Sequence, residues 1–264
     1  YTEAQQLIKE HAAPVLNEVR DKAFEDFRRQ GFPTKKVERY KYTDMQKLFE
    51  PDYGLNLNRL EIPVNPYDTF KCDVPNLSTS LYFIVNDQFY SKSLPKAKLN
   101  DGVIVDSLNH VATERPELVA KYYGRLANTE ADAITALNTM LAQDGLFIYV
   151  PKNVQLERTI QVINILRSDV DLMVNRRVLI VLEEGAKAQF LFCDHAADDR
   201  NFLATQVIEA YVGANANLEL NCLEETHAKN VRVSNVYIEQ QRDSRASHNV
   251  ITLHNGVTRN MLDL

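Results

Sequence analysis

A pair of short strand-like segments recurs about every 28 residues between positions 146 and 253, and this repeat restricts the fold more than any other feature. Each segment is rich in aliphatic and β-branched residues and is bounded by turn-forming residues. The segments are residues 146–150, 159–166, 177–182, 188–193, 205–212, 216–222, 231–238 and 245–253. One pair of strands cannot bury its apolar face alone, whereas stacked pairs bury a continuous core, so the repeat predicts a solenoid.

Residue types at the corners indicate the register of the repeat. Residues 185–190 align with residues 213–218 at a shift of 28, because both begin with Gly-Ala and continue with alternating apolar residues. Alternation with polar residues continues to Cys222, which places one face of this strand in a core. We therefore expect two ladders of stacked side chains, one of Ile160, Ala188 and Ala216 and one of Val162, Phe190 and Leu218.

An antiparallel sandwich or barrel would also use short alternating strands. Those folds need tight hairpins, yet no Asn-Gly or Asp-Gly pair joins neighbouring segments of the repeat. We therefore favour a mainly β fold, with a parallel β-helix of two strands per turn over residues 146–264 and a helical and mixed region over residues 1–145. The end turn of a β-helix needs a cap or a partner, and residues 253–264 offer no obvious cap, so we expect the β-helix to be truncated there.

The first 145 residues carry helical patterns and two short strands. Apolar residues recur at three- and four-residue steps from a capping-box-like start at residues 2–5 to Gly31, and Pro14 predicts a kink or two helices. Residues 50–77 have no sustained period, which predicts an irregular connection. Further helices are expected over 116–123 and 131–143, and strands over 81–85 and 103–105.

Composition narrows the class of protein. A formal net charge of −6 gives no general attraction to nucleic acid or to an anionic membrane. Three cysteines without CxxC spacing build neither a disulfide framework nor a zinc ribbon, which fits a reducing compartment. The longest aliphatic run, residues 178–182, is far shorter than the roughly 20 residues that span a bilayer, and no signal-peptide pattern is present. We expect a soluble, cytoplasmic protein.

Possible metal ligands are densest just after the fourth segment of the repeat. A thiol, an imidazole and carboxylates could serve iron or zinc, but their spacing matches no metal motif. We expect a buried cysteine at a strand end, followed by a solvated acidic loop. Cys222 alternates in phase with apolar residues and is expected to be a small core residue, and Cys72 an exposed or half-buried thiol. The residues of the cluster are Cys193, Asp194, His195, Asp198 and Asp199.

Other titratable residues have functional and structural interpretations. His227, His248 and His254 could bind a metal, although surface or strand-packing roles are favoured for single histidines. The charges that flank the third segment could supply the acid and base of a carbohydrate-processing solenoid, or simply form a solvated turn. These charged residues are Asp169, Asp171, Arg176 and Arg177.

A basic and aromatic segment near the N-terminus resembles a nucleic-acid patch. Its basic residues are Arg28, Arg29, Lys35, Lys36, Arg39 and Lys41, and its aromatic residues are Phe32, Tyr40 and Tyr42. The acidic net charge argues against nucleic acid, so we expect a docking or packing segment in which Tyr40 and Tyr42 bury their rings. The chain has neither a GxxxxGK[ST] phosphate loop nor a GxSxG elbow, which excludes those routes to ATP or ester hydrolysis.

An ordered series of motifs resembles the SufB/SufD family of iron–sulfur cluster assembly proteins. The motifs are Gly31-Phe32-Pro33-Thr34-Lys35-Lys36-Val37-Glu38-Arg39-Tyr40-Lys41-Tyr42-Thr43, Ala136-Leu137-Asn138, Asp144-Gly145-Leu146-Phe147-Ile148-Tyr149-Val150-Pro151, Glu157, Arg177 to Ala186 and His254 to Asn260. They cover nearly the whole chain, and residues 31–43 are more similar to the SufD branch than to the SufB scaffold. The chain departs from the family at Asn255-Gly256, where two glycines are more usual.

The resemblance implies a β-helix subunit without catalytic, cofactor-binding or metal-ligating residues in this chain. It implies pairing with a SufB paralogue through the C-terminal edge of the β-helix and docking of the ATPase SufC by a later region. The family histidine implicated in cluster assembly lies beyond Leu264. The iron–sulfur cluster would be held transiently by the assembled complex, and the chain alone could form a homodimer. A carbohydrate-active β-helix enzyme and a SufB-like scaffold remain the alternatives.

Overall fold

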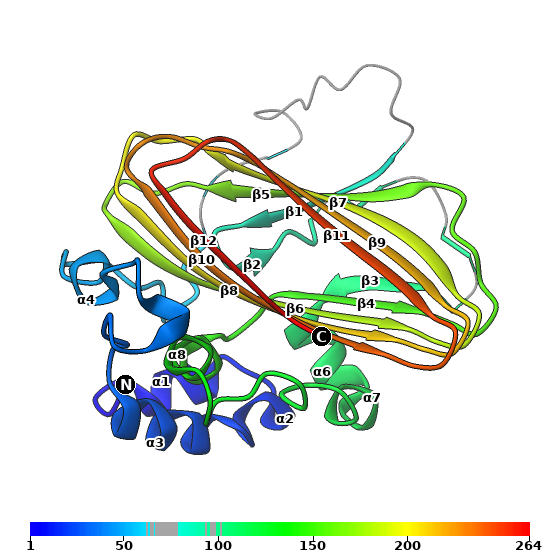
Figure 1. Ribbon diagram of the computed structural model, residues 1–264, viewed down its shortest axis with the longest axis horizontal. Helices are drawn as coiled ribbons and strands as arrows, with labels where there is room; N and C mark the ends of the chain where they lie inside the picture. Colours follow the sequence, from blue (N-terminus) through cyan, green and yellow to red (C-terminus); the bar gives the residue numbers. More distant parts are fainter. Residues whose placement is uncertain (62, 64–65, 67–78, 93, 96–98, 101) are drawn as a thin grey trace.

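Two sheets form the walls of a flattened coil, and helices lie along one of them (Figure 1). The computed structural model describes residues 1–264 except 62, 64–65, 67–78, 93, 96–98 and 101. The strands are β1 (Thr79–Val85), β2 (Gln88–Phe89), β3 (Ile104–Ser107), β4 (Leu146–Val150), β5 (Thr159–Leu166), β6 (Leu172–Leu182), β7 (Lys187–Ala196), β8 (Phe202–Val212), β9 (Asn217–Glu225), β10 (Asn230–Gln240), β11 (Arg245–His254) and β12 (Val257–Asp263).

The strands confirm a parallel β-helix of about four turns. One wall, sheet A, has the order β12-β10-β8-β6-β4-β3, and the other, sheet B, has the order β11-β9-β7-β5-β1-β2. Every segment of the predicted repeat is a strand, and its neighbours in the repeat pair with it in parallel. Two antiparallel strands, β2 and β3, lie at the first-coil edge of the two sheets. The walls begin before residue 146, because β1 pairs with β5.

The spacing between successive strands of sheet A becomes shorter by two residues at each step. One inward-facing column of sheet A contains Leu146, Val178, Ile208, Val236 and Leu262, which are 32, 30, 28 and 26 residues apart. Side chains of a strand alternate between its faces, so only an even change in coil length keeps the same residues inside. The first four residues of this column are no more than 2% exposed.

The predicted register is wrong by two residues at both steps of the ladders, from β5 to β7 and from β7 to β9. Ile160 pairs with Phe190, and Phe190 pairs with Leu220, at a shift of 30 instead of 28. Because the error is even, the inward face is still the predicted one. The error arises at the corner before β7. There Gly185 stacks on Asn215 of the next coil and not on Gly213.

A left-handed backbone conformation recurs at this corner in every coil. The residues that adopt it are Asn153, Gly185, Asn215 and Asp243, with φ of 60°, 70°, 58° and 58°. Asn, Asp and Gly are the residues that tolerate this region with least strain. Gly213 has a different role. A β-carbon there would come within 2.8 Å of the backbone of Glu183, so glycine is needed because two coils approach each other closely at this point.

Helices occupy the N-terminal region and the connection to the β-helix. They are α1 (Gln5–Glu10), α2 (Pro14–Asn17), α3 (Arg20–Gln30), the 3-10 helix η1 (Glu38–Tyr40), α4 (Met45–Leu48), α6 (Leu108–Glu114), α7 (Pro116–Ala120) and α8 (Ala133–Leu141). The predicted kink at Pro14 is a full break, because Pro14 starts α2 and Ala13 before it is extended. Three helices thus replace one or two. None of the described helices has the length and apolar character needed to cross a membrane.

The outer face of sheet A is apolar and carries the helices. Phe147 and Leu179, whose side chains alternate with the inward column, are fully buried against residues of α2, α6 and α7. Figure 1 shows the helices along this wall and none of them on sheet B. Every residue of α8 is buried, because it lies between α3 and the sheet. The predicted irregular connection is seen over residues 50–61, and much of its remainder lies outside the described residues.

The positive φ of Asn215 predicts that valine and glycine at this position have different effects on stability. The side chain is exposed, so it can be changed without disturbing the core. Asn215→Val should lower the free energy of unfolding by about 1–2 kcal/mol, because a β-branched residue is strained at positive φ. Asn215→Gly should leave it nearly unchanged. Urea denaturation of the three proteins measures both effects. Equal losses in the two variants would contradict the role of the backbone conformation.

Candidate functional site

The predicted cluster after the fourth segment does not converge on one point. Cys193 is fully buried on the outer face of sheet B, in a cluster with Phe83 and Ile163. Asp194 faces the opposite side, because neighbouring residues of a strand alternate. Asp198 accepts hydrogen bonds from Arg167, and Asp199 forms an ion pair with Lys229 at 2.8 Å. Within the described residues, no group of three or more His, Cys, Asp or Glu side chains could hold a metal ion.

Four buried charges inside the β-helix form the main polar constellation instead. Arg176 Nη1 lies 2.6 Å from Asp194 Oδ1, and Arg232 Nε lies 3.3 Å from Asp194 Oδ2. Arg232 also pairs with Glu224. Each of these residues follows or precedes an inward apolar residue by an even number of positions, so all four point into the coil. Each residue is at most 5% exposed.

The ion pairs balance one another electrostatically. Burial alone raises the pKa of the Asp194 carboxyl, but the guanidinium groups of Arg176 and Arg232 outweigh it and hold that pKa below its usual value. Arg176 Nε also donates to the backbone oxygen of Asn86, in the turn between β1 and β2. Two cations face two anions, so this charged core, defined as Arg176, Asp194, Glu224 and Arg232, is neutral as a whole.

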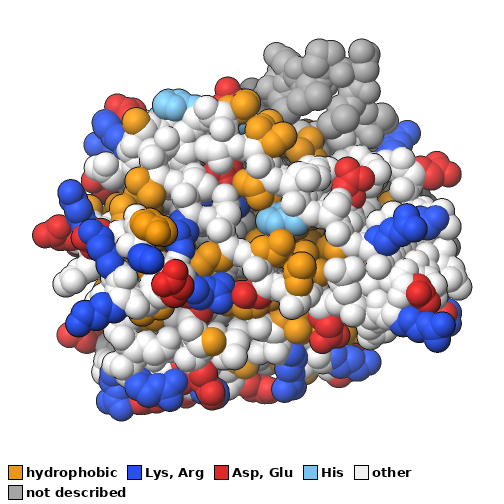
Figure 2. All heavy atoms as spheres, viewed as in Figure 1, with side chains coloured by type: hydrophobic (Ala, Val, Ile, Leu, Met, Phe, Trp, Pro, Cys, Tyr) orange, Lys and Arg blue, Asp and Glu red, His pale blue; other side chains and the backbone are white. Residues whose placement is uncertain are grey.

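The charged core reaches the last coil. Glu224 Oε2 accepts hydrogen bonds from Thr252 Oγ1 at 3.0 Å and from Thr258 Oγ1 at 2.7 Å. These threonines lie on β11 and β12, which form the outer edges of the two sheets. Both strands are nearest the viewer in Figure 1, and Figure 2, drawn from the same side, shows hydrophobic side chains gathered across this surface beside a histidine. We call this surface, made by β11 and β12, the end face.

Cys222 lies in the core of the β-helix, as its alternation predicts. Its Sγ atom is 3.8 Å from Nε2 of His248 on β11. Burial raises the pKa of the Cys222 thiol to about 11, and burial together with the Arg232 guanidinium lowers the pKa of the His248 imidazole. At neutral pH the pair is therefore a protonated thiol beside a neutral imidazole. Such a pair packs and hydrogen-bonds weakly, and its thiol is not activated as a nucleophile.

The other histidines have structural contacts or exposed positions. His227 Nε2 lies 2.8 Å from the backbone oxygen of Asp198, and its Nδ1 accepts from the backbone nitrogen of Lys229. Both contacts are satisfied by one neutral tautomer, with the proton on Nε2. His254 is exposed, and its backbone oxygen accepts from Thr226. Cys72 lies outside the described residues.

The charges around the third segment point in different directions. Asp171 accepts two hydrogen bonds from Asn201, and Asp169 is an exposed partner of Arg167. Arg176 points into the β-helix. Arg177, its neighbour, points outward and pairs with buried Glu209 at 2.6 Å. No acid and base meet among these residues, as a carbohydrate-cleaving site would require.

Sequence reasoning did not identify the buried partners Glu209, Glu224 and Arg232. Each is a charged residue on a strand, and the polar residues that share these strands hid the signal. Glu209 accepts from the backbone nitrogens of Gly124, Leu126 and Ala127, so it also holds the loop after α7 against the sheet.

The basic and aromatic segment divides into a buried and an exposed part. Tyr40 is 1% exposed and donates its hydroxyl to Asp132 at 2.7 Å, as expected. Tyr42 is 87% exposed, so the prediction that its ring is buried is wrong. Its ring has Lys41 Nζ at 5.5 Å from the centroid instead of an apolar partner. Arg39 pairs with Asp263 at 2.7 Å, which ties this segment to β12.

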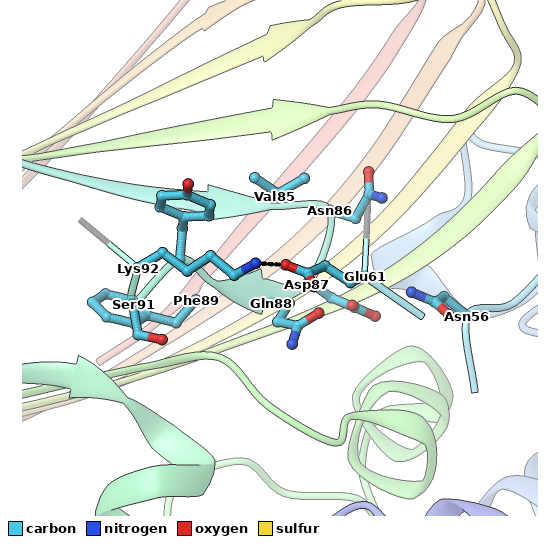
Figure 3. A pocket seen from close by; sticks show the side chains of 10 residues that line it. Asn56, Glu61, Val85, Asn86, Asp87, Gln88, Phe89, Ser91 and Lys92 are labelled. Atoms are coloured by element: carbon cyan, nitrogen blue, oxygen red, sulfur yellow. Dashed lines mark ion pairs between the residues drawn. The ribbon is translucent and has the colours of Figure 1, made fainter. Parts of the chain in front are cut away.

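A small cavity of about 240 Å³ lies beside the β1–β2 hairpin, at the opposite edge of the sheets from the end face. Figure 3 shows the side chain of Lys92 reaching Glu61, with which it forms an ion pair. Asp87 of the same lining pairs with Arg59 at 2.7 Å. No sequence pattern indicates this cavity, and its charged side chains form ion pairs.

Two protein-family models match the chain in succession. The model described as the SufBD protein N-terminal region matches residues 1–162, and the model described as the SUF system FeS cluster assembly, SufBD core domain, matches residues 164–264. The boundary between the two matches falls within β5.

Several curated proteins are similar to part of the chain. A chloroplastic iron–sulfur cluster assembly SufBD family protein of Arabidopsis thaliana is 32% identical over 143 residues, which are 53% of this chain and 24% of that protein. A SufBD family protein of Synechocystis is 32% identical over 135 residues, 50% of this chain and 28% of that protein. The iron–sulfur cluster assembly protein SufD of Bacillus subtilis is 31% identical over 120 residues, 45% and 27% of the two chains. The matches thus span about a quarter of each relative.

The charged core predicts a large loss of stability when one partner is removed. Asp194→Ala should lower the free energy of unfolding by about 3–5 kcal/mol, because Arg176 would remain buried without its counter-charge. Asp199→Ala removes an exposed carboxylate and should change stability little. Denaturant unfolding of the two variants tests the difference, and similar small losses would show that the core charges are not coupled.

The same carboxylate predicts a pH dependence. The pKa of Asp194 is lower in the folded chain than in the unfolded chain, so its stabilising effect is present above the unfolded pKa, about 4, and is lost as the pH falls through the folded pKa. The stability difference between the parent chain and Asp194→Ala should therefore narrow as the pH is lowered below about 4. A difference that stays constant would contradict the depressed pKa.

Proposed function

Because this chain belongs to the SufBD family of iron–sulfur cluster assembly proteins, we propose that it acts as a SufD-like, non-catalytic subunit of a cluster assembly complex. Its partners in this proposal are a SufB paralogue and the ATPase SufC. The observation that carries the proposal is the ordered match of the two family models, which together cover nearly the whole chain on a β-helix. The SufD-like role is supported by the similarity to the Bacillus protein of that name.

The end face suits a second β-helix as well as a further coil of the same one. β11 and β12 are the last strands of the two sheets in this sequence, and their backbone groups can pair with another strand. Ile251, Leu253 and Leu262 are 56%, 63% and 45% exposed there. Strand addition supplies affinity through the backbone, and apolar side chains add burial.

We further propose that the chain keeps no cofactor of its own and works in the cytoplasm. The iron–sulfur cluster would be bound transiently by the assembled complex, as its product. This part of the proposal is distinct from a SufB-like scaffold, which would use Cys193 or Cys222 to hold nascent iron or sulfur. Both cysteines are buried, and Cys193 packs among apolar side chains. Assembly activity that survives Cys193→Ala and Cys222→Ala would exclude the scaffold role.

Co-purification tests the proposal as a whole. The full-length gene product, expressed with SufB and SufC, should elute from size exclusion as one ternary complex, and the complex should carry iron and sulfide after reconstitution. A chain that elutes alone, binds neither protein and instead binds polysaccharide would contradict it and favour the carbohydrate-active alternative.

An end-face variant tests how the partner binds. Ile251→Glu should weaken binding of the SufB paralogue at least tenfold, because a carboxylate would be buried in an apolar contact. Val170→Glu is the matched control, since Val170 is 58% exposed at a corner away from β11 and β12. Titration followed by light scattering or calorimetry measures both affinities. Equal affinities for the two variants would show that the interface does not include the end face.

A further inference from the structure

The corner between β11 and β12 contains the one Asn-Gly pair of the sequence, Asn255-Gly256. The backbone nitrogen of the residue after an asparagine can attack the side-chain carbonyl carbon. A glycine in that place has no side chain to obstruct the approach. Neither the family match nor the proposed function assigns a role to this pair.

Hydrogen bonds hold the Asn255 carboxamide in a defined orientation. Its Oδ1 atom accepts from the backbone nitrogen of Gly256 at 2.8 Å and from Thr226 Oγ1 at 2.9 Å. Its Nδ2 atom donates to Thr258 Oγ1 at 2.6 Å. The first contact keeps the Gly256 nitrogen beside Cγ, the atom to which Oδ1 is bonded. Nucleophile and electrophile are thus already neighbours, which removes much of the entropic cost of the reaction.

We propose that Asn255 is a site of spontaneous deamidation that the folded corner promotes. The Gly256 nitrogen loses its proton to water and attacks Cγ, forming a carbon–nitrogen bond. The bond from Cγ to Nδ2 then breaks, and Nδ2 leaves as ammonia after taking a proton from water. The product is a cyclic succinimide. Water opens this ring at either carbonyl and yields aspartate or isoaspartate at position 255.

Thr226 is the residue that favours the reaction. During the attack, negative charge develops on Oδ1, and the Thr226 hydroxyl already points a hydrogen bond at that atom. The corner also requires glycine at position 256, because a β-carbon there would come within 2.2 Å of the backbone oxygen of Ala228.

The reaction would loosen the corner that it occurs in. Thr258 Oγ1 already donates its hydrogen to Glu224 Oε2 at 2.7 Å, and it accepts from Asn255 Nδ2. Deamidation replaces that donor by a carboxylate oxygen, so one hydroxyl would stand between two carboxylates. It would also add a negative charge at the end face, next to the charged core.

Peptide mapping by mass spectrometry tests the proposal. The purified chain is incubated at mildly alkaline pH, and aspartate and isoaspartate at position 255 are quantified over time. Asn255 should convert at least as fast as the same residue in a synthetic peptide of residues 251–259. Asn249, which is followed by valine on the same β-helix edge, should remain intact as the internal reference.

Two variants test the role of Thr226. Thr226→Val should slow the conversion roughly tenfold, the value of one hydrogen bond of about 1.4 kcal/mol to the developing charge. Thr226→Ser keeps the hydroxyl and should retain the parent rate. Circular dichroism verifies that both variants are folded. Conversion slower in the folded chain than in the peptide, or equal rates in the valine and serine variants, would overturn the proposal.

Discussion

Each coil of the β-helix must bring its strands back with the same side chains facing inward, and the rest of the structure depends on this condition. In sheet A the spacing between successive strands shortens from 32 to 26 residues in steps of two, so the inward column from Leu146 to Val236 stays apolar. The same alternation turns Phe147 and Leu179 outward, where they become the surface on which the helices pack. A coil with one residue more or less would exchange these two faces, exposing the core and burying polar residues under the helices.

Apolar columns alone would not fix the register, because a slip of two residues leaves apolar residues facing apolar residues. The charged core does not tolerate such a slip. Its members come from β6, β7, β9 and β10, and each ion pair joins different strands. A slip would separate Asp194 from Arg176 and leave both charges buried without a partner, at a cost of several kcal/mol. The buried ions therefore contribute to choosing one register among several that the apolar residues allow.

The sequence was most informative where a pattern repeats and least informative where distant residues meet. Strand positions and inward faces follow from alternation, which is local, and they were predicted. The register error arose because Gly185 was matched to Gly213 by residue type, whereas the corner selects for positive φ and accepts Asn215. Tyr42 was expected to be buried like Tyr40, but its ring is exposed and has the neighbouring Lys41 over it, whereas Tyr40 reaches the distant Asp132. Arg176 was assigned to a solvated turn because its partners, Asp194 and the backbone of Asn86, are 18 and 90 positions away in the chain.

The two regions matched by the family models do not form independent structural units. β1, β3, β4 and half of β5 belong to the first match, yet they are strands of the same two sheets as the second. Arg176 of the second region donates to the backbone of Asn86 in the first, and Arg39 of the first pairs with Asp263 near the end of the second. The N-terminal region therefore contacts both the first and the last coil. The contact with the last coil is reinforced within this region, because Arg39 and Tyr40 share the carboxylate of Asp132.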